Sequence, residues 1–343
     1  MKHFSKLKND EVFVIAEVGQ NHQGDLDIAK QYIRRFTDAG ADAIKFQTRN
    51  NKYLFSSEAY NRPYDTENSF GNTYGEHREH LELPINKLHE LKEECEKSGS
   101  IFMSTPFDEP SLKILIDLQI ELLKIASFDL GNLSLAEQIG KSGISVVLST
   151  GGGNLEHITS TLNVFEKYKN EVGLLHCVSQ YPCEYNYLSL SKIKQLKSMF
   201  PNTVVGLSDH FNGILSGPIA FTMGARIFEK HVTFNRAWKG TDHSFSLELE
   251  GFRRFVRDIK RVPKMIEVNE VNIGEEPVFK KLGKVIVAKR NIKNNTKILL
   301  EDLKGQICTV EGIPVRDTFK VVGKTSRVEI KENEPITFDS LGD

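Results

Sequence analysis

Short, continuous apolar runs recur along the first three quarters of the chain, and segments with helical spacing separate most of them. Continuous apolar runs, rather than strict alternation, are typical of parallel strands that are covered on both faces. Eight such runs with intervening helices predict a (β/α)8 TIM barrel, an α/β fold. The predicted strands cover residues 12–19, 42–47, 101–106, 122–127, 145–150, 172–179, 204–209 and 227–232. Helical spacing covers residues 25–39, 85–99, 154–168 and about 248–267.

The segment between the second and third predicted strands, residues 51–83, is much longer than a barrel connection requires. We predict an elaborated loop of the kind that often builds a binding site. The segment between the last two predicted strands reads as one helix, and each of these strands ends at a histidine, His210 and His231.

The strand and helix pattern stops near residues 268–281, and an internal repeat follows it. Residues 292–303 and 330–341 match with a constant offset at Ile292/Ile330, Lys293/Lys331, Asn295/Asn333, Ile298/Ile336 and Leu303/Leu341. Two copies are too few for a solenoid, so we predict a small pseudo-symmetric domain of about 60 residues. Such a domain is close to the lower size limit of independent stability, and we expect it to pack on another surface. The predicted organisation is a barrel at 1–270, a linker at 271–282 and the small domain at 283–343.

The composition is that of an ordinary globular protein, with 343 residues, 39% apolar and 27% charged residues and a net charge of −1. This balance argues against nucleic acid or an anionic membrane surface as a general partner. The first residues lack the apolar core of a signal peptide, and no stretch reaches the length of a membrane span. The four cysteines are scattered and form no CxxC pair, so we expect a reducing, cytoplasmic environment.

Polar side chains gather at the carboxyl ends of the predicted strands, which converge on one face of a barrel and carry its chemistry. They are Glu17, Lys45, Gln47, Ser104, Thr105, Lys124, Ser127, Ser149, Thr150, His176, Ser179, Ser208, Asp209, His210, Glu229, Lys230 and His231. The seventh and eighth strands are neighbours in a closed barrel, so His210 and His231 can face one site. They would suit a divalent metal with open positions, or they are hydrogen-bonded structural histidines. His22 and His176 are further candidates.

Two lysines, Lys45 and Lys124, lie inside apolar strands, where an unpaired charge is costly. Three interpretations remain open from the residues alone. Both lysines could bind a phosphate or carboxylate, one could be a Schiff-base nucleophile, or each could extend its amine to a solvated rim.

Eight segments together resemble the sialic acid synthase (N-acetylneuraminate synthase) family. They occur in the order FVIAEVGQNHQGDLDIAKQYI, ADAIKFQT, FMSTPFD, LLKIAS, VVLSTGG, LLHCVSQYP, VGLSDH and EKHVTFNRAWKGTDHSFSLE. The C-terminal block is similar to the small antifreeze-like (SAF) domain of that family. The resemblance implies a metal-dependent condensation of phosphoenolpyruvate with the aldehyde of an N-acetyl hexosamine-type sugar, giving a nonulosonic acid and phosphate. It implies Mn²⁺ as the usual metal, with Mg²⁺, Co²⁺ or Zn²⁺ as substitutes.

The resemblance also implies roles for individual residues. His210 and His231 correspond to the metal ligands, and Glu17 to a carboxylate near the reacting carbons. The residues implied to bind phosphoenolpyruvate are Lys45, Lys124, Ser127, Ser149 and Ser208, with Thr105 and Asn68 nearby. Gln47, Tyr181 and Asp242 correspond to contacts with the sugar or beside the metal. A homodimer with exchanged C-terminal domains is implied as well.

Three positions depart from the family pattern. Asp129 stands where members usually have Glu, and Ser179 where many have Asn. In the small domain, the stretch CTVEGI places Cys308 at the position of a sugar-binding arginine, which removes a cation and a two-pronged donor. We therefore predict an altered acceptor sugar. A Schiff-base barrel aldolase and a catalytically inactive carbohydrate-binding relative are the two alternatives.

Overall fold

The computed structural model describes residues 3–5, 7, 10–268 and 276–343. It divides into two compact units, Met1–Glu267 and Val268–Asp343. Residues 271–275 of the predicted linker lie outside the described residues, and the rest of it contains the short helix α12 (Pro277–Leu282). Each unit is described by itself below.

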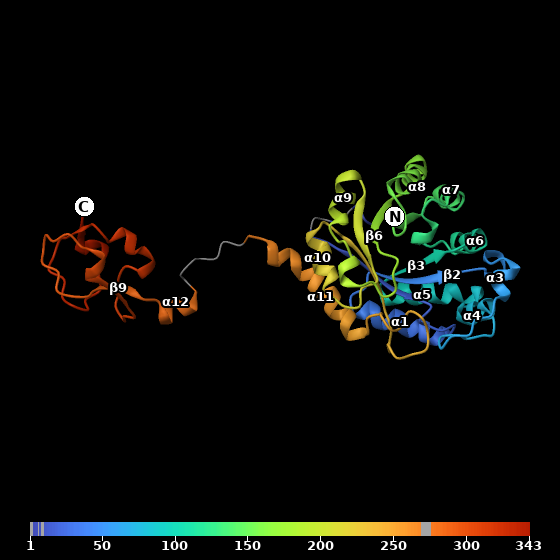
Figure 1. Ribbon diagram of the computed structural model, residues 1–343, viewed down its shortest axis with the longest axis horizontal. Helices are drawn as coiled ribbons and strands as arrows, with labels where there is room; N and C mark the ends of the chain where they lie inside the picture. Colours follow the sequence, from blue (N-terminus) through green and yellow to red (C-terminus); the bar gives the residue numbers. More distant parts are fainter. Residues whose placement is uncertain (1–2, 6, 8–9, 269–275) are drawn as a thin grey trace. The chain divides into compact units, whose positions relative to one another are not determined.

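The first unit is a closed barrel of eight parallel strands in the order β1 to β8, which confirms the predicted fold (Figure 1). The strands are β1 (Phe13–Gly19), β2 (Ala43–Thr48), β3 (Ile101–Pro106), β4 (Leu122–Ile125), β5 (Ser145–Ser149), β6 (Val172–Cys177), β7 (Val204–Asp209) and β8 (Ile227–His231). The last strand pairs with the first, with Glu17 opposite His231. This closure brings residues from both ends of the barrel sequence to one site.

Helices surround the strands, as in other barrels of this kind. They are α1 (Leu26–Asp38), α5 (Leu88–Ser98), α6 (Glu109–Asp117), α7 (Leu133–Ser142), α8 (Leu155–Tyr168), α9 (Lys192–Met199), α10 (Ser216–Thr222) and α11 (Leu249–Ile266). Short 3-10 helices occupy Ile85–Lys87, Ser127–Asp129 and Tyr185–Tyr187. Local signals fix the starts of several helices. The side chain of Asp25 accepts a hydrogen bond from the amide of Ile28 at the start of α1.

The alternation of side chains along each strand divides the barrel unit into two cores. Outward-facing residues such as Val14, Ala16 and Phe46 pack against the helices in the main core. Inward-facing residues at the amino ends, such as Phe13 and Ile15, form a separate apolar cluster with Phe4 inside the barrel. Because side chains repeat with a period of two, the next inward positions along the strands belong to polar residues. The barrel interior is therefore apolar at one end and polar at the end where the strands finish.

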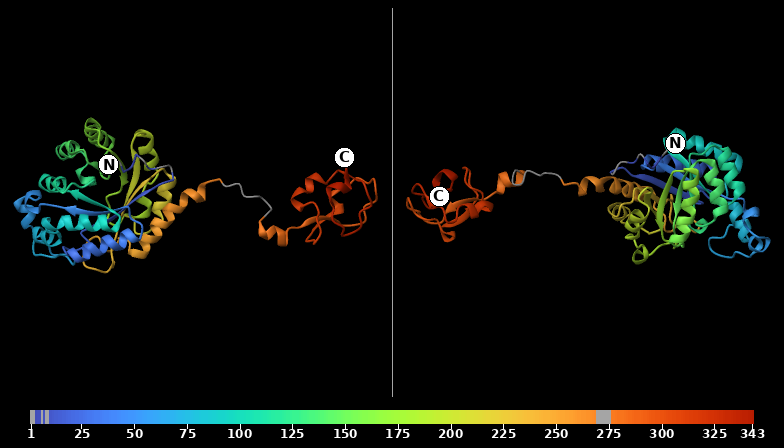
Figure 2. Two further views of the ribbon diagram at one scale, coloured as in Figure 1. Left: turned by 180° about the vertical axis from the view of Figure 1, so that it is seen from behind. Right: turned by 90° about the horizontal axis from the view of Figure 1, so that it is seen from above.

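The predicted loop at residues 51–83 contains three short helices, α2 (Asn51–Leu54), α3 (Ser57–Asn61) and α4 (Tyr74–Leu81). Thr73 and Glu76 form a reciprocal capping box at the start of α4. We call residues 49–83 the β2–β3 insert. In Figures 1 and 2 its light blue ribbon lies at the edge of the barrel unit, beyond β2.

The second unit has the internal symmetry that the sequence repeat predicts. Ile292 and Ile330 hydrogen-bond to each other through both backbone groups, at 2.8 and 2.9 Å. The equivalent residues Asn295 and Asn333 both adopt the left-handed conformation, with φ of 59° and 66°. The unit contains the paired strands β9 (Val285–Ala288) with β10 (Leu303–Gln306) and β11 (Thr325–Ser326) with β12 (Leu341–Gly342). Its 3-10 helices are Leu300–Asp302, Val315–Lys320 and Phe338–Ser340.

A helix that spans a bilayer must be both long and apolar. None of the helices among the described residues combines the necessary length with a sufficiently apolar sequence.

Candidate functional site

A cavity of about 210 Å³ opens where the barrel strands end. It brings together most of the residues that the sequence predicted for a site. Those lining it are Glu17, Lys45, Gln47, Thr105, Lys124, Ser127, Ser149, Tyr181, Ser208, His210, His231 and Asp242.

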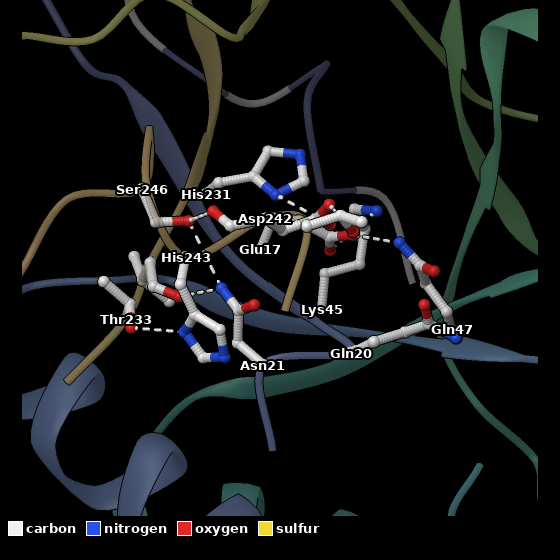
Figure 3. A network of polar contacts seen from close by, with 12 residues as sticks. Glu17, Gln20, Asn21, Lys45, Gln47, His231, Thr233, Asp242, His243 and Ser246 are labelled. Atoms are coloured by element: carbon white, nitrogen blue, oxygen red, sulfur yellow. Dashed lines mark hydrogen bonds and ion pairs between the residues drawn. The ribbon is translucent and has the colours of Figure 1, made fainter. Parts of the chain in front are cut away.

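Four buried, charged side chains, one from each of four strands, form one ion-pair network. We call it the strand cluster: Glu17 of β1, Lys45 of β2, Lys124 of β4 and Glu229 of β8. The Lys45 Nζ lies 2.7 Å from Glu17 Oε2 and 3.6 Å from Glu229 Oε1, and the Lys124 Nζ lies 3.5 Å from Glu229 Oε2. All four side chains are at most 4% exposed. Figure 3 shows Lys45 beside Glu17. Two ammonium groups thus share two carboxylates away from solvent.

Burial and mutual attraction shift the pKa values within the strand cluster in different directions. Burial raises the pKa of the Glu17 carboxyl, although Lys45 opposes this shift. For Glu229, burial also favours the neutral form, but Lys124 and Lys45 outweigh it and lower the pKa to about 2. Burial lowers the pKa of the Lys124 amine, while Glu229 opposes it. Glu17 is therefore the carboxyl of the cluster that most readily holds a proton.

Hydroxyl groups surround the two ammonium groups. Lys45 donates to Thr105 Oγ1 at 3.3 Å, and Ser208 Oγ donates to Glu229 Oε1 at 3.4 Å. The Oγ atoms of Ser127 and Ser179 lie 2.8 Å apart. The Ser149 Oγ is buried and has no hydrogen-bond partner among the described residues. A buried hydroxyl without a partner, beside two cations, is suited to an anionic ligand.

The loop after Ser149 must approach these hydroxyls closely. A Cβ atom at Gly151 would lie 2.3 Å from the Oγ of Ser179 and 3.0 Å from the Cβ of Ser127. Any side chain at this position would push the serines apart. The glycines of the sequence STGGGN therefore allow the chain to pass behind the serine pair.

The two predicted metal-binding histidines lie side by side at the cavity wall. Their ring centroids are 5.3 Å apart, and the Tyr181 ring centroid lies 4.1 Å from that of His210. The His210 Nδ1 is hydrogen-bonded to the carbonyl of Val178 at 2.9 Å, so Nδ1 carries the proton and the lone pair of the neutral ring is on Nε2. The His231 Nδ1 is buried without a hydrogen bond among the described residues, and Asp242 Oδ2 lies 3.7 Å from it.

These two imidazoles have the chemistry that a metal ligand needs. Burial lowers the pKa of His231 to about 4, so this ring is neutral near pH 7 and has a lone pair to donate. Within the described part of the chain, no group of three or more His, Cys, Asp or Glu side chains is arranged around one point. The histidines therefore fit an ion held by two protein ligands, with its remaining positions open to water or substrate oxygens.

Gln47 links the strand cluster to the β2–β3 insert. Its Nε2 donates to Glu17 Oε1 at 2.8 Å, and its Oε1 accepts from Arg49 at 2.5 Å. Gly19 has a φ of 56°, and a Cβ atom there would lie 3.2 Å from both the Glu17 Oε1 and the Gln47 Nε2. Glycine at the end of β1 therefore leaves room for the Glu17–Gln47 bond.

Three predicted site residues do not line the cavity. Asn68 accepts a hydrogen bond from the amide of Gly240 at 2.9 Å and so ties the β2–β3 insert to the loop after β8. Asp129 accepts from Asn132 at 3.0 Å, and burial raises its pKa. Ser179 contacts the hydroxyl of Ser127, and it is Ser127 that lines the cavity. Their roles toward a ligand remain predictions.

The additional histidine candidates face elsewhere. His176 lies on the outer side of β6, where its Nε2 is 2.7 Å from the carbonyl of Leu188. His22 is buried, and its Nδ1 accepts from the amide of Gly24 at 3.0 Å. Both side chains therefore hydrogen-bond to backbone groups, and neither lines the cavity. Lys230 and Asp209 also face outward, and they form a buried ion pair at 2.7 Å behind the two cavity histidines.

Several residues of the cavity wall escaped the sequence predictions. They are Gln20, Arg49, Arg78, Phe107, Ala126, Phe128, Cys177, Glu229 and Thr241. Glu229 was recognised as a polar strand end without a role. Arg49 follows Gln47, and Phe107 follows Thr105, at the two-residue spacing that keeps side chains on one face of a strand. That spacing is a signal that could have identified both.

Comparisons with known proteins agree with this geometry. The NeuB family model matches residues 32–270, and the SAF domain model matches residues 283–342. The chain is 34% identical over 326 residues to the N-acetylneuraminate-9-phosphate synthase of Homo sapiens, covering 94% of this chain and 91% of the relative. It is 32% identical over 335 residues to the N,N'-diacetyllegionaminic acid synthase of Campylobacter jejuni, covering 95% and 99%.

A solved structure supports the same relationship. The N-acetylneuraminic acid (sialic acid) synthetase of Leptospira borgpetersenii, crystallised in complex with citrate, matches with a TM-score of 0.68 at 34% identity. The match covers 80% of this chain and 90% of that chain.

Proposed function

Because the chain belongs to the NeuB family, we propose that it joins phosphoenolpyruvate to the open-chain aldehyde of an N-acetyl hexosamine-type sugar. C3 of phosphoenolpyruvate bonds to the aldehyde carbon, water adds at C2, and the C–O bond to the phosphate breaks. Three carbons and six carbons give a nine-carbon nonulosonic acid, and inorganic phosphate is released. The names of the human and Campylobacter jejuni relatives support a product of this class.

The observation that carries this proposal is the pairing of the two buried lysines with hydroxyls in one cavity that two imidazoles also line. Phosphoenolpyruvate carries a phosphate and a carboxylate, so its desolvation requires nearby cations. Lys45 and Lys124 would hold these two groups. The hydroxyls that would complete the anion site are those of Thr105, Ser127, Ser149 and Ser208.

Glu17 would hold or move a proton beside the reacting carbons. Its Oε2 contacts Lys45 and its Oε1 accepts from Gln47, so the carboxyl is fixed in orientation. Its raised pKa allows it to carry a proton that the developing alkoxide or departing phosphate can receive. We assign Gln47, Tyr181 and Asp242 to the sugar or to the surroundings of the metal. Asn68 is assigned to the phosphoenolpyruvate side, and Asp129 and Ser179 to substrate binding.

His210 and His231 would hold a divalent metal, with Mn²⁺ as the expected ion and Mg²⁺, Co²⁺ or Zn²⁺ as alternatives. When bound, such an ion supplies Lewis acidity toward the aldehyde oxygen or toward a water molecule. The contact of His210 with the Val178 carbonyl orients its ring for this role.

One observation favours a second function, a Schiff-base aldolase. Burial lowers the pKa of the Lys124 amine, although Glu229 opposes this shift, and a lowered amine pKa favours the nucleophilic form that such enzymes use. Borohydride treatment in the presence of pyruvate separates the two functions. A covalent adduct on Lys124 would support the aldolase, whereas chelator-sensitive phosphate release without an adduct would support the synthase.

We also propose that two copies of the chain pair with exchanged C-terminal units. A domain of about 60 residues is marginally stable alone, so a surface on a second copy would stabilise it. Sedimentation of the full chain would test the pairing, and a monomer at micromolar concentration would contradict it.

The direct test of the function combines purified protein, Mn²⁺, phosphoenolpyruvate and a panel of N-acetyl hexosamines. Phosphate release is followed, and products are identified by mass spectrometry. We expect phosphate release that requires both the sugar and the metal, with a product three carbons longer than the sugar. Absence of release with every sugar would overturn the proposal.

A further inference from the structure

A buried ion pair, which we call the outer pair, joins the two strands that carry the cavity histidines: Asp209 of β7 and Lys230 of β8. The Lys230 Nζ lies 2.7 Å from Asp209 Oδ2, and both side chains are 1% exposed. The two residues are direct partners in the register of β7 and β8. Each is followed in the chain by a histidine, His210 or His231. The outer pair therefore lies one residue before the two imidazoles, on the opposite face of the strands.

The outer pair interrupts an apolar surface. On the same face, the preceding residues at two-residue spacing are Val205 and Leu207 of β7 and Phe228 of β8, and all three belong to the main core. Removal of two charges from water is costly, and apolar side chains of similar size in place of a buried ion pair often give an equally stable protein. Stability alone is therefore a poor explanation for charged residues at this place.

The outer pair fixes the turn that carries His210. Asp209 Oδ1 accepts a hydrogen bond from the amide of Phe211 at 3.0 Å, and Lys230 donates to the carbonyl of the same residue. Both backbone groups of Phe211 are thus bound to the pair, and His210 lies between two anchored neighbours. The Ser216 hydroxyl donates to Asp209 Oδ2 at 2.5 Å and so holds the carboxylate from α10.

The same contacts link the two histidines to each other. The ammonium of Lys230 reaches from β8 to the carboxylate of Asp209 and to the carbonyl after His210, and the next residue of β8 is His231. A shift of the end of β7 along β8 would therefore break charge-assisted hydrogen bonds, which are stronger than neutral ones. The outer pair thus fixes the separation of the two rings, whose centroids lie 5.3 Å apart.

A metal ion that is shared by two imidazoles tolerates little change in their separation. Each ligand nitrogen must lie about 2.0–2.2 Å from the ion, so the two nitrogens cannot be farther apart than about 4 Å. The outer pair has one charge of each sign, so it can fix this geometry without adding net charge beside the cation.

We propose that Asp209 and Lys230 are positioning residues for a metal site formed by His210 and His231. They act through the backbone at the two strand ends, and neither side chain is among those that line the cavity. This inference rests on the proposed function, because it takes the two imidazoles as the ligands of a divalent ion. It places a determinant of metal affinity on the outer face of the barrel strands.

The test measures Mn²⁺ binding to the full chain by electron paramagnetic resonance of the free ion, without substrates. Lys230→Met removes the ammonium but leaves the Asp209 carboxylate buried and unpaired. The double variant Asp209→Leu with Lys230→Met replaces the whole pair by apolar side chains, so it should keep the fold. In both proteins the dissociation constant of Mn²⁺ should rise about 10- to 100-fold. Calorimetry in metal-free solution should show a change of less than about threefold in phosphoenolpyruvate affinity.

Phe165→Leu is the matched control for a loss of stability. Phe165 is buried in the main core on α8, so its substitution should lower the free energy of unfolding and leave Mn²⁺ affinity unchanged. Unchanged Mn²⁺ affinity in the folded double variant would overturn the inference. Equal weakening of Mn²⁺ and phosphoenolpyruvate binding would also overturn it, because the outer pair would then support the cavity as a whole.

Ser216→Ala is a milder variant that removes one hydrogen bond from Asp209 and leaves the ion pair in place. It should weaken Mn²⁺ binding about threefold. If the double variant does not fold, this variant decides the inference, and unchanged Mn²⁺ affinity would contradict it.

Failure of the inference and failure of the proposed function are distinguishable, because Mn²⁺ binding is measured without turnover. If no sugar supports phosphate release, the proposed function fails, and the binding constants still decide the inference. His210→Ala locates the ion, since it should weaken Mn²⁺ binding more than either change in the outer pair. Equal Mn²⁺ binding by the wild type and His210→Ala, or no binding by the wild type, would overturn the inference.

Discussion

Two arginines of the cavity wall, Arg49 and Arg78, form a second cationic region that we call the arginine pair. The strand cluster and the arginine pair border one cavity, but they are built in opposite ways. In the strand cluster, two lysines are matched by two carboxylates, and all four side chains are at most 4% exposed. In the arginine pair, Glu82 forms an ion pair with Arg49, whereas Arg78 is held by the neutral side chains of Tyr74 and Gln20 and has no ion pair among the described residues. The first region needs its internal pairs to be stable without a ligand, whereas the second retains charge for one. Burial, more than the type of charge, therefore decides how each region is balanced.

The largest effect should follow from removal of a histidine next to the strand cluster. His210→Ala removes one of the two proposed metal ligands, so metal-stimulated phosphate release should fall about 1,000-fold or more. Phosphate release measured against Mn²⁺ concentration checks this. Near-normal turnover would remove His210 from the metal site.

Removal of one carboxylate from each region should separate their stabilities. Glu229→Gln leaves the buried Lys124 without its ion-pair partner and should lower the free energy of unfolding by about 3–5 kcal/mol. Glu82→Gln leaves Arg49 with the side-chain oxygen of Gln47 and the Phe107 ring, and should cost about 1–2 kcal/mol.

Urea denaturation followed by the fluorescence of the single tryptophan, Trp238 in the barrel unit, measures both changes. Both substitutions replace a carboxylate by an amide of nearly the same shape, so the difference between them reports the loss of charge. Equal destabilisation by the two substitutions would contradict the distinction between the regions.

A lysine substitution should affect one substrate only. Lys124→Ala removes a cation from the proposed phosphoenolpyruvate site, and its KM for phosphoenolpyruvate should rise about 100-fold. The KM for the sugar should stay within about threefold of the wild type. Steady-state kinetics with each substrate varied in turn provide the measurement. A change confined to the sugar would show that the two ends of the cavity are assigned the wrong way round.

The smallest expected effect is a pH dependence of phosphoenolpyruvate binding that arises from Glu17. Its pKa is raised by burial, so the folded protein holds this proton to a higher pH than the unfolded chain does. The corresponding stability is present at low pH and is lost as the pH rises through the folded-state pKa. Ionisation adds a negative charge beside Lys45, so phosphoenolpyruvate should bind more weakly as the pH rises, by up to about tenfold.

Calorimetry of wild type and Glu17→Gln over one common pH range isolates this protein group, because the ionisation of the ligand's phosphate affects both proteins equally. Glu17→Gln imitates the protonated carboxyl, so the ratio of the two affinities should change as the pH rises, with the wild type becoming the weaker binder. A ratio that stays constant over the whole range would contradict a role for Glu17 ionisation in binding.

Much of the fold and of the strand cluster was predictable because strand geometry is periodic. Polar residues that follow apolar ones at two-residue spacing, such as Lys45 and Lys124, must enter the barrel interior near its carboxyl end. The same periodicity explains why His176 was a poor candidate, since it lies one residue out of phase and faces outward. The internal repeat likewise predicted equivalent local structure in its two copies. Its equivalent residues Asn295 and Asn333 both adopt the left-handed backbone conformation.

The arginine pair was not predicted, because the β2–β3 insert has no period from which its tertiary contacts follow. Arg78 reaches the cavity through contacts with Tyr74 on its own helix and with Gln20, which is 58 positions away in the sequence. Asn68 is a second residue of the insert whose tertiary contact could not be predicted from the sequence. It was expected at the ligand, and it instead bonds to the backbone of Gly240.

The central claim is that the buried lysines of the strand cluster bind phosphoenolpyruvate, and a comparison of binding constants tests it most directly. The dissociation constant of phosphoenolpyruvate is measured by calorimetry for the wild type, Lys124→Ala and Arg78→Gln. We predict that Lys124→Ala weakens binding about 100-fold, whereas Arg78→Gln, which also removes a cation of the cavity wall, changes it by less than about threefold. Comparable weakening by the two substitutions would contradict the account.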